Sequence, residues 1–414
     1  MIAGAMKKNL KLAFLSIHSS PFSQPGAGDT GGMSIYIREL SRQLVMLGCT
    51  ADIFTRCQDS QLPETEIISP GLRLINIQAG KPETMDKLLT YSHAPDVACR
   101  IANYCRQYNL HYDIIFSHYW ISGICGLYLH SWWQIPHFIM FHTLGAVKNA
   151  IGIGEDEPDL RIAEEKLLVR ECDRIIASTH KERHFLSLYY DVQPEKVSIV
   201  PCGVNMDIFK PVAKNAARNA VGIDNPEDRV VIFVGRIERL KGIEQLIRAI
   251  ALLKNDHLRL LIIGEDGNRQ GEVERLKSIS VNLGVADQAS FPGLIDHGKL
   301  PLYYNAADVC ILPSYYESFG LVPLEALACG TPVVAAPVGD LQNIIIQGKT
   351  GYVVPDNRPE SLAAKIAEII SRPDFWAGRQ AFIRKSVLSY NWRNIAGSLL
   401  KIFNDATAHF PVYT

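Results

Sequence analysis

YYESFGLVPLE, residues 315–325, follows the apolar run ADVCILP at residues 307–313. The run is short and rich in apolar residues, which favours a buried strand. Pro323 suits the first turn of a helix, and Gly330 followed by Pro332 indicates where that helix ends. We therefore predict a strand, a tight loop and a short helix whose first backbone N–H groups form an anion site.

Two carboxylates flank this predicted anion site. Glu317 lies in the loop, and Glu325 lies about one turn inside the helix. Beside a lone phosphate they would be repulsive, but a carboxylate can accept hydrogen bonds from two neighbouring hydroxyls of a ribose or hexose. A nucleoside-diphosphate sugar combines a diphosphate with such diols. The alternative is that Glu317 caps the helix and Glu325 is a solvated surface residue.

Length and composition narrow the class of protein. A chain of 414 residues favours two domains, and 47% apolar with 21% charged residues is typical of soluble globular proteins. The formal net charge of −1 argues against a nucleic-acid partner. No run of about 18 apolar residues and no apolar signal-peptide core occur, so we expect a cytoplasmic protein without a transmembrane segment. Nine cysteines without a C-x-x-C pair predict free thiols and no metal site. The sequence does not decide whether the protein is a monomer or a homodimer.

Strand and helix patterns alternate in both halves of the chain, as in parallel α/β sheets. Strands are predicted at residues 10–17, 51–55, 113–117, 138–141, 174–178, 197–200, 229–235, 258–264, 307–313 and 333–335, and helices in the second half at residues 240–253 and 272–283. A composition shift at 205–228 predicts an interdomain linker, and an apolar helix at 390–403 is expected to pack across the domain boundary. The predicted fold class is α/β, with two Rossmann-like doubly wound domains facing a central cleft. Their expected limits are residues 1–205 plus about 388–414, and residues 206–387.

The stretch HSSPFSQPGAGDTGG at residues 18–32 predicts a long loop, and long loops in compact domains are usually functional. Gly26, Gly28 and Gly31 match G-x-G-x-x-G, but they start too far beyond the preceding strand. The next strand also lacks an acidic residue for a ribose, so a nicotinamide site is disfavoured. Gly31 and Gly32 are instead expected to let the backbone approach a ligand closely.

Polar residues cluster just after predicted strand ends, where open α/β sheets bind ligands. In the first half these are His118 and His142, and a packed or capping role is the alternative for His118. In the second half Arg236 and Lys241 follow the strand at 229–235. They supply the cations that a diphosphate needs beside two carboxylates, unless both are simply solvated surface cations.

Three stretches occur together here: ESFGLVPLE, GRIERLKG and GDTGGMS. Jointly they resemble the retaining glycosyltransferases of family 4, which have two Rossmann-like domains (GT-B), and the resemblance covers nearly the whole chain. HSSPFSQPGAGDTGGMSIYI, FSHYWISG and FHTLGAVKN are most similar to the enzymes that transfer N-acetylglucosamine from UDP to inositol phosphate in mycothiol synthesis. Sucrose-phosphate and sucrose synthases are the next most similar.

The resemblance implies roles for the donor side. Arg236 and Lys241 would hold the diphosphate, Glu325 the ribose and Glu317 the hexose, while His142 would lie beside the reacting sugar. Backbone groups of the loop and of the glycine pair would complete the site. The implied catalytic residues are His142, Arg236, Lys241 and Glu317, and the implied donor-binding residues are Gly31, Gly32, Arg236, Lys241, Leu294, Glu317, Ser318, Phe319, Gly320, Leu321 and Glu325.

On the acceptor side, the inositol-phosphate enzymes hold the phosphate with a tyrosine, a threonine, an arginine and a lysine. Tyr119, Thr143 and Arg161 match the first three, and Lys81 is taken as the fourth from a loop that aligns poorly. His142 and Ser34 complete the implied set, although those enzymes carry asparagine in place of Ser34. Taken alone, Arg161 could simply pair with Glu164 and Glu165.

The resemblance also implies the chemistry: a hexose, glucose or N-acetylglucosamine, moves from a UDP-sugar to a small phosphorylated acceptor by same-face attack. No cofactor besides this substrate and no metal are expected. Alternatives are a sucrose-synthase-like or sucrose-phosphate-synthase-like enzyme, a glycan-extending transferase, a UDP-sugar 2-epimerase and a non-catalytic sugar-nucleotide binder. A lipid-linked acceptor would need a basic or apolar surface helix, for which Lys7, Lys8 and Lys11 are too little.

Overall fold

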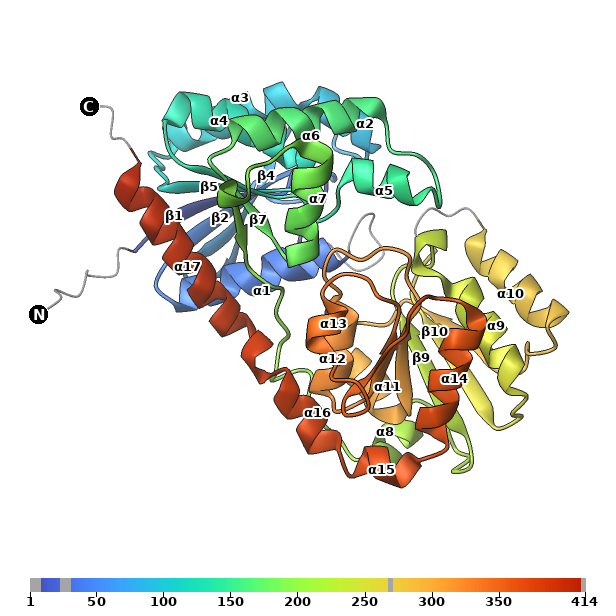
Figure 1. The fold of residues 1–414 in the computed structure, drawn as a ribbon. Coiled ribbons are helices and arrows are strands. Elements are labelled where there is room, and N and C mark those ends of the chain that lie inside the picture. Colours follow the sequence, from blue (N-terminus) through green and yellow to red (C-terminus); the bar gives the residue numbers. More distant parts are fainter. Residues whose placement is uncertain (1–8, 23–30, 267–270, 411–414) are drawn as a thin grey trace, which may run out of the picture. The chain divides into compact units, whose positions relative to one another are not determined.

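The computed structural model describes residues 9–22, 31–266 and 271–410 (Figure 1). The chain divides into two compact units. The first comprises residues up to 147, residues 157–201 and residues from 392 onward, and the second comprises residues 148–156 and 202–391. Each is an α/β domain built on a mostly parallel sheet.

The sheet of the first unit has eight strands in the order β3-β4-β2-β1-β5-β6-β7-β8. Every pair is parallel except β3 with β4. Since β1 pairs with both β2 and β5, the strand order reverses at β1, and the β1/β5 edge is where such sheets bind ligands. The strands are β1 (Lys11–Leu15), β2 (Thr50–Arg56), β3 (Thr65–Ser69), β4 (Leu72–Ile77), β5 (Ile114–His118), β6 (His137–Met140), β7 (Arg174–Ala177) and β8 (Val197–Ile199).

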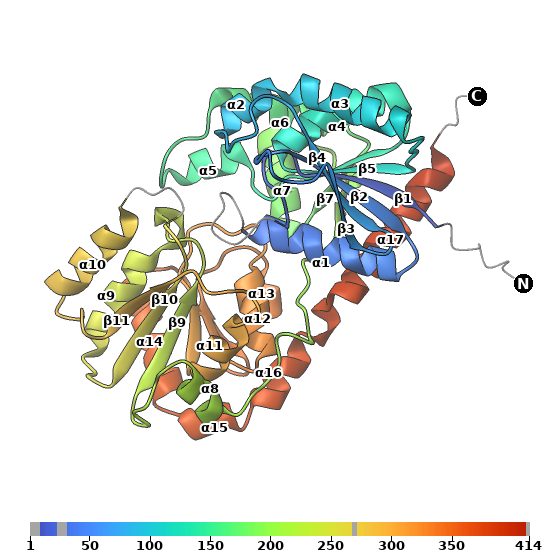
Figure 2. The same ribbon diagram turned by 180° about the vertical axis from the view of Figure 1, so that it is seen from behind.

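Helices cover both faces of this sheet (Figures 1 and 2). On one face α17 packs along α1, and the ring of Phe403 lies 4.9 Å from that of Phe138. The C-terminal helix therefore completes the core of the first unit. The helices are α1 (Gly32–Met46), α2 (Lys87–Ser92), α3 (Ala94–Gln107), α4 (Trp120–Trp133), α6 (Asp159–Glu171), α7 (His180–Tyr190) and α17 (Trp392–His409), with the 3-10 turn η1 (Pro194–Lys196). The short helix α5 (Gly145–Ile151) begins in the first unit and ends in the second.

The second unit has a six-stranded parallel sheet in the order β11-β10-β9-β12-β13-β14. Relative to the chain this is 3-2-1-4-5-6, the doubly wound order, with the switch between β9 and β12. The predicted fold class is confirmed in that both domains are doubly wound α/β units. The strands are β9 (Arg229–Val234), β10 (Leu258–Ile263), β11 (Ala289–Gly293), β12 (Val309–Leu312), β13 (Val333–Ala335) and β14 (Gly351–Val353).

The helix predicted from residue 240 is in fact a 3-10 turn, η2 (Arg239–Lys241), followed by α9 (Ile243–Leu253). Gly242 separates the two with φ 66°, and a Cβ there would lie 2.1 Å from the carbonyl oxygen of Pro313. Only glycine allows this turn to lie against the end of β12. The other elements are α8 (Lys214–Ala220), α10 (Glu272–Asn282), α11 (Leu300–Ala306), α12 (Leu321–Ala328), α13 (Leu341–Ile344), α14 (Pro359–Ile370), α15 (Pro373–Ala377), α16 (Gln380–Ser386) and η3 (Leu388–Tyr390).

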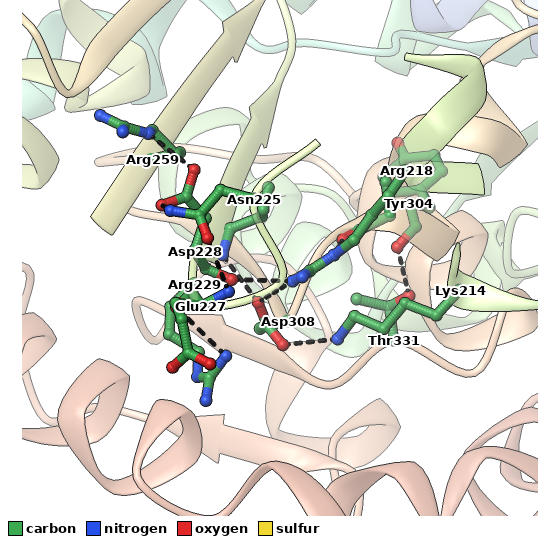
Figure 3. Close-up of polar contacts among 12 residues, drawn as sticks. Lys214, Arg218, Asn225, Glu227, Asp228, Arg229, Arg259, Tyr304, Asp308 and Thr331 are labelled. Carbon is green, nitrogen blue, oxygen red and sulfur yellow. Dashed lines mark hydrogen bonds and ion pairs between the residues drawn. The ribbon is translucent and has the colours of Figure 1, made fainter. Parts of the chain in front are cut away.

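The stretch 205–228 is not a linker as predicted, because it is folded into the second unit. Arg218 on α8 is buried and donates to Asp308 Oδ2 at 2.9 Å and to the carbonyl oxygen of Asp228 at 3.0 Å (Figure 3). Lys214 donates to the other oxygen of Asp308 at 2.5 Å. The mixed charges that suggested solvent exposure are instead partners in a buried network, where each charge must be paired.

The sequence also led to predictions about the cysteines, about membrane-spanning helices and about metal sites. All nine cysteines are free, and eight are buried, as expected. None of the described helices is both long enough and apolar enough to cross a bilayer. Within the described ranges, no group of three or more His, Cys, Asp or Glu side chains is arranged to hold a metal ion.

Candidate active site in two domains

The predicted strand, loop and helix around residues 315–325 are present as β12, a loop and α12. Gly320 precedes α12 with φ 100°, a backbone conformation that favours glycine. A Cβ on Gly339 would lie 2.6 Å from the carbonyl oxygen of Phe319, so the loop after β13 packs directly on the loop that carries Glu317, Ser318 and Phe319. Leu321 begins the helix, as the anion-site prediction requires.

Lys241 and Glu317 form an ion pair at the switch point of the second sheet. Lys241 Nζ donates to Glu317 Oε1 at 2.5 Å, and the Ser314 hydroxyl donates to the same oxygen at 3.1 Å. Both charged side chains are mostly buried. The structure thus brings together the predicted diphosphate cation and the predicted hexose-binding carboxylate, each held in place by the other.

Two other predicted donor residues lie on the same unit and are more exposed. Arg236 follows β9 and forms an ion pair with Glu238 at 3.3 Å. Exposed pairs of this kind contribute little stability, so the guanidinium could turn toward an anionic ligand at small cost. Leu294, just after β11, is an exposed apolar side chain.

Glu325 is buried, which excludes the alternative of a solvated surface residue. Its Oε1 lies 2.7 Å from His297 Nε2, and the Tyr304 hydroxyl donates to its Oε2 at 2.8 Å. Burial and the Glu325 carboxylate raise the pKa of Tyr304 well above its usual value, so the phenol stays a donor. His297 and Tyr304 therefore fix the carboxylate, while each oxygen keeps a lone pair for a ligand hydroxyl.

In the first unit, Tyr119 at the end of β5 has φ 74° and ψ 157°, a backbone conformation found almost exclusively for glycine. The guanidinium of Arg161 lies 4.8 Å from the centre of its ring, and the ring of His18 lies 4.5 Å away. Residues held in such strained conformations cluster at functional sites. Tyr119 is thus fixed at the ligand-binding edge of the sheet.

Arg161 and Thr143 join Tyr119, as predicted for the acceptor set. Arg161 is buried, and its Nη2 donates to the Thr143 hydroxyl at 3.0 Å and carbonyl at 2.7 Å. Its Nη1 pairs with Glu157 at 2.8 Å, and its Nε pairs with Glu165 at 2.7 Å. The alternative role, in which Arg161 pairs with Glu164 and Glu165, is confirmed for Glu165 only. Glu164 instead accepts a hydrogen bond from the Tyr91 hydroxyl.

The lysine that lies at the Tyr119 ring is Lys87, with its ammonium 5.9 Å from the ring centre. Lys81 is an exposed residue of the preceding loop, where its carbonyl accepts a hydrogen bond from the buried Arg56 at 2.9 Å. Lys87 starts α2, whose N-cap is Asp86. The cap indicates where the helix begins, but not that Lys87 meets Tyr119.

His142 lies two residues beyond β6, at the centre of a three-residue turn closed by the Thr143 N–H and the Phe141 carbonyl at 2.7 Å. Its φ is 61°, another strained conformation. His142 Nε2 lies 3.0 Å from Nδ1 of His118, which is fully buried, as the packed alternative for His118 expected. Burial, reinforced by His18, lowers the pKa of His142 to about 3.

Residues at the start of α1 lie close to His142. The ring of Tyr36 lies 5.4 Å from that of His142, and the buried Ser34 donates its backbone N–H to the carbonyl of Gly31 at 3.0 Å. A Cβ on Gly31 would meet no atom within 4 Å in the described parts of the chain, so the packing there does not itself require glycine. Gly32 is exposed; Gly26 and Gly28 lie outside the described residues.

Comparisons with known proteins match this architecture. The model of Glycosyltransferase Family 4 matches residues 30–208, and that of Glycosyl transferases group 1 matches residues 215–386. The chain is 37% identical over 408 residues to D-inositol 3-phosphate glycosyltransferase 2 of Catenulispora acidiphila, covering 95% of this chain and 94% of the relative. This chain is a family 4 glycosyltransferase.

A second relative of this glycosyltransferase is the D-inositol 3-phosphate glycosyltransferase of Kribbella flavida, 38% identical with 96% of each chain covered. Among solved structures, a sucrose-phosphate synthase from Thermosynechococcus elongatus superposes with a TM-score of 0.87 at 32% identity, covering 96% of this chain and 99% of that one. The resemblance inferred from the sequence is confirmed at the level of family and enzyme class.

For a glycosyltransferase, the two units offer complementary chemistry. The second provides a lysine, an arginine and two carboxylates at the β9/β12 edge, which suits a diphosphate joined to polyhydroxylated rings. The first provides two cations, a phenol and a hydroxyl around Tyr119, and a histidine pair at the ends of β5 and β6.

Proposed function

We propose that this glycosyltransferase moves a hexose, glucose or N-acetylglucosamine, from a UDP-sugar to a small phosphorylated polyol or sugar, with retention of configuration. The observation that carries the proposal is the cluster around Tyr119. Arg161 and Lys87 lie over its ring, and the Thr143 hydroxyl is 3.0 Å from Arg161. Two cations and two hydroxyls within one small region are the groups that a phosphate monoester requires.

The two cations of the cluster, Arg161 and Lys87, differ in how far nearby carboxylates neutralise them. Arg161 already pairs with Glu157 and Glu165, so it orders Thr143 and Tyr119 as much as it attracts an anion. Lys87 brings a second positive charge to the Tyr119 ring, and a lysine on the first residue of a helix can reach a phosphate as a point charge. In this proposal Lys87 replaces Lys81 as the phosphate-binding lysine.

The donor is proposed to bind to the second unit. Glu325, held by His297 and Tyr304, would accept the ribose hydroxyls, and Lys241 with Arg236 would hold the diphosphate. During transfer the bond from the anomeric carbon to UDP breaks, and a bond to the acceptor oxygen forms on the same face. The acceptor proton passes to the departing diphosphate, whose charge the two cations stabilise.

A second candidate is a sucrose-phosphate-synthase-like enzyme, with fructose 6-phosphate as acceptor. It is supported by the TM-score of 0.87 to the Thermosynechococcus elongatus enzyme and by Ser34, a position at which the resemblance to inositol-phosphate enzymes implies asparagine. Ser34 is buried, and in the described part of the chain its hydroxyl has no hydrogen-bond partner.

The test is nucleotide release with a panel of UDP-, GDP- and ADP-sugars, each offered inositol phosphate, fructose 6-phosphate and the unphosphorylated forms. We expect UDP release only with a phosphorylated acceptor, and NMR of the product should show the anomeric configuration of the donor. Equal use of free inositol or fructose would support a glycan-extending or sucrose-synthase-like role. Acceptor-independent UDP release would point to an epimerase, and no release at all to a binding protein.

A further inference from the structure

His118 and His142 form a hydrogen-bonded pair in which only one ring can be the donor. His118 Nδ1 lies 3.0 Å from His142 Nε2. His118 is fully buried, with its ring stacked at 15° on Phe14 and 4.3 Å from Phe116. His142, in contrast, keeps part of its surface accessible. The pair therefore links a core residue to one that a substrate can reach.

Two arrangements of the shared proton are possible when both rings are neutral. If His142 Nε2 donated, His118 would carry its own proton on Nε2. Within the described residues that nitrogen is buried and has no hydrogen-bond partner. Orphaned buried N–H groups are rare, whereas a bare lone pair is tolerated more often. The second arrangement, in which His118 Nδ1–H donates to His142 Nε2, avoids a buried donor without an acceptor.

We propose that His118 is a positioning residue that fixes His142 as the tautomer protonated on Nδ1. His142 then presents a neutral N–H at the ring position that does not face His118. Resting on the proposed function, this N–H would donate to a hydroxyl of the transferred hexose. His142 would orient the sugar and would not act as a general acid.

The surroundings of the pair support neutral rings. Burial lowers the pKa of His118 well below its usual value, and it lowers that of His142 to about 3. His18 and Tyr36 are two titratable groups that lie beside the pair. Burial disfavours the charged form of both rings, so both histidines stay neutral at neutral pH.

The first test needs neither variant nor substrate. The ring nitrogen shifts of His142 in the ligand-free full-length protein, measured by NMR with 15N-labelled histidine, should report protonation on Nδ1. Protonation on Nε2 would overturn the inference, whatever the protein transfers. Because no substrate is involved, this outcome is separate from any failure of the proposed function.

Variants then test the consequence. His118→Asn keeps a donor where Nδ1 lies and should keep both the tautomer and kcat. His118→Asp offers only acceptors, so it should move the His142 proton to Nε2 and lower kcat about tenfold or more, with little change in acceptor KM. His137→Asn is the matched control, because His137 is also fully buried and hydrogen-bonded, to Ser117, but should leave the His142 tautomer unchanged. An active His118→Asp enzyme with a shifted tautomer would overturn the proposed role of His142.

Discussion

The ammonium of Lys241 lies 2.5 Å from Glu317 Oε1, although 76 positions separate the two residues in the chain. The contact joins the turn after β9 to the loop after β12. A diphosphate that binds Lys241 must share the lysine with Glu317, and a hexose that binds Glu317 approaches a carboxylate already oriented by a cation. Under the proposed function, the two residues therefore act as one unit in donor binding.

Replacing Lys241 should show how strongly Lys241 and Glu317 depend on each other. Lys241→Ala should lower kcat/KM about a hundredfold, since it removes a charge that stabilises the departing diphosphate and leaves Glu317 without its cation. Steady-state UDP release measures this. Lys277→Ala, which removes an exposed lysine paired with Glu274, is the matched control and should change little. Near-normal turnover of Lys241→Ala would remove Lys241 from the catalytic set.

Glu325 is expected to act through binding of the nucleotide rather than through the reaction. Glu325→Ala should weaken UDP affinity by about 1.5–3 kcal/mol, the value of charge-assisted hydrogen bonds. Tyr304→Phe, which removes one of the donors that orient the carboxylate, should have a smaller effect. Calorimetric titration with UDP distinguishes the two. If Glu325→Ala binds UDP as the parent does, the ribose assignment fails.

Replacing Lys87 and replacing Lys81 should have different effects on the KM of the acceptor. Lys87→Ala should raise the KM of the phosphorylated acceptor about tenfold or more and leave the KM of the UDP-sugar unchanged, because it removes one charge-assisted contact to phosphate. Lys81→Ala provides the control and should leave both KM values unchanged. The opposite result would restore Lys81 to the acceptor site.

Arg161 is a poor target for kinetics because its loss should unfold the site. Glu165 is fully buried and also accepts from Tyr190 and from the backbone of Gly145. Arg161→Ala leaves that carboxylate without its cation, which should cost about 3–5 kcal/mol of unfolding free energy. Denaturant melts measure the loss. An Arg161→Ala protein of parent stability would mean that the buried pair is neutralised in some other way.

Buried histidines should make the protein less stable in acid. In the unfolded chain His137 protonates near pH 6.5, but burial lowers its folded pKa to about 3. Between these values the unfolded state binds a proton that the native state does not, so the unfolding free energy falls as pH falls. His137→Gln should reduce this slope by up to about 1.4 kcal/mol per pH unit relative to the parent protein. Unfolding titrations from pH 7 to pH 4 report both slopes.

The sequence predicted best the strands that consist of buried apolar runs. The strand at 333–335 has the predicted limits, and β9, β10 and β12 lie within one or two residues of theirs. It missed β3, β4, β11 and β14. β11 contains both a proline and a glycine, and β14 has only three residues, so neither carries a clear strand pattern. β3 lies at the sheet edge and is largely exposed, which removes the apolar signal.

The positions of the candidate site residues were predictable where a motif placed them next to a strand end, as for Lys241, Glu317 and Tyr119. Those that act through tertiary contacts were not. His297 precedes Glu325 by 28 positions, and nothing in its local sequence indicates that they meet. The same holds for Lys87, whose proximity to Tyr119 depends on how α2 packs beside α4.

The helix α17 has a consequence for how the protein is made. Phe403 packs on Phe116 and Phe138, and Trp392 packs on Tyr36, so the hydrophobic core of the first unit includes residues that leave the ribosome only after the second unit has been synthesised. Until they emerge, the apolar face between α1 and the sheet stays open while the whole second unit is synthesised. The second unit is therefore the first that can complete its fold during translation, and the nascent first unit is the part whose apolar surface stays exposed longest.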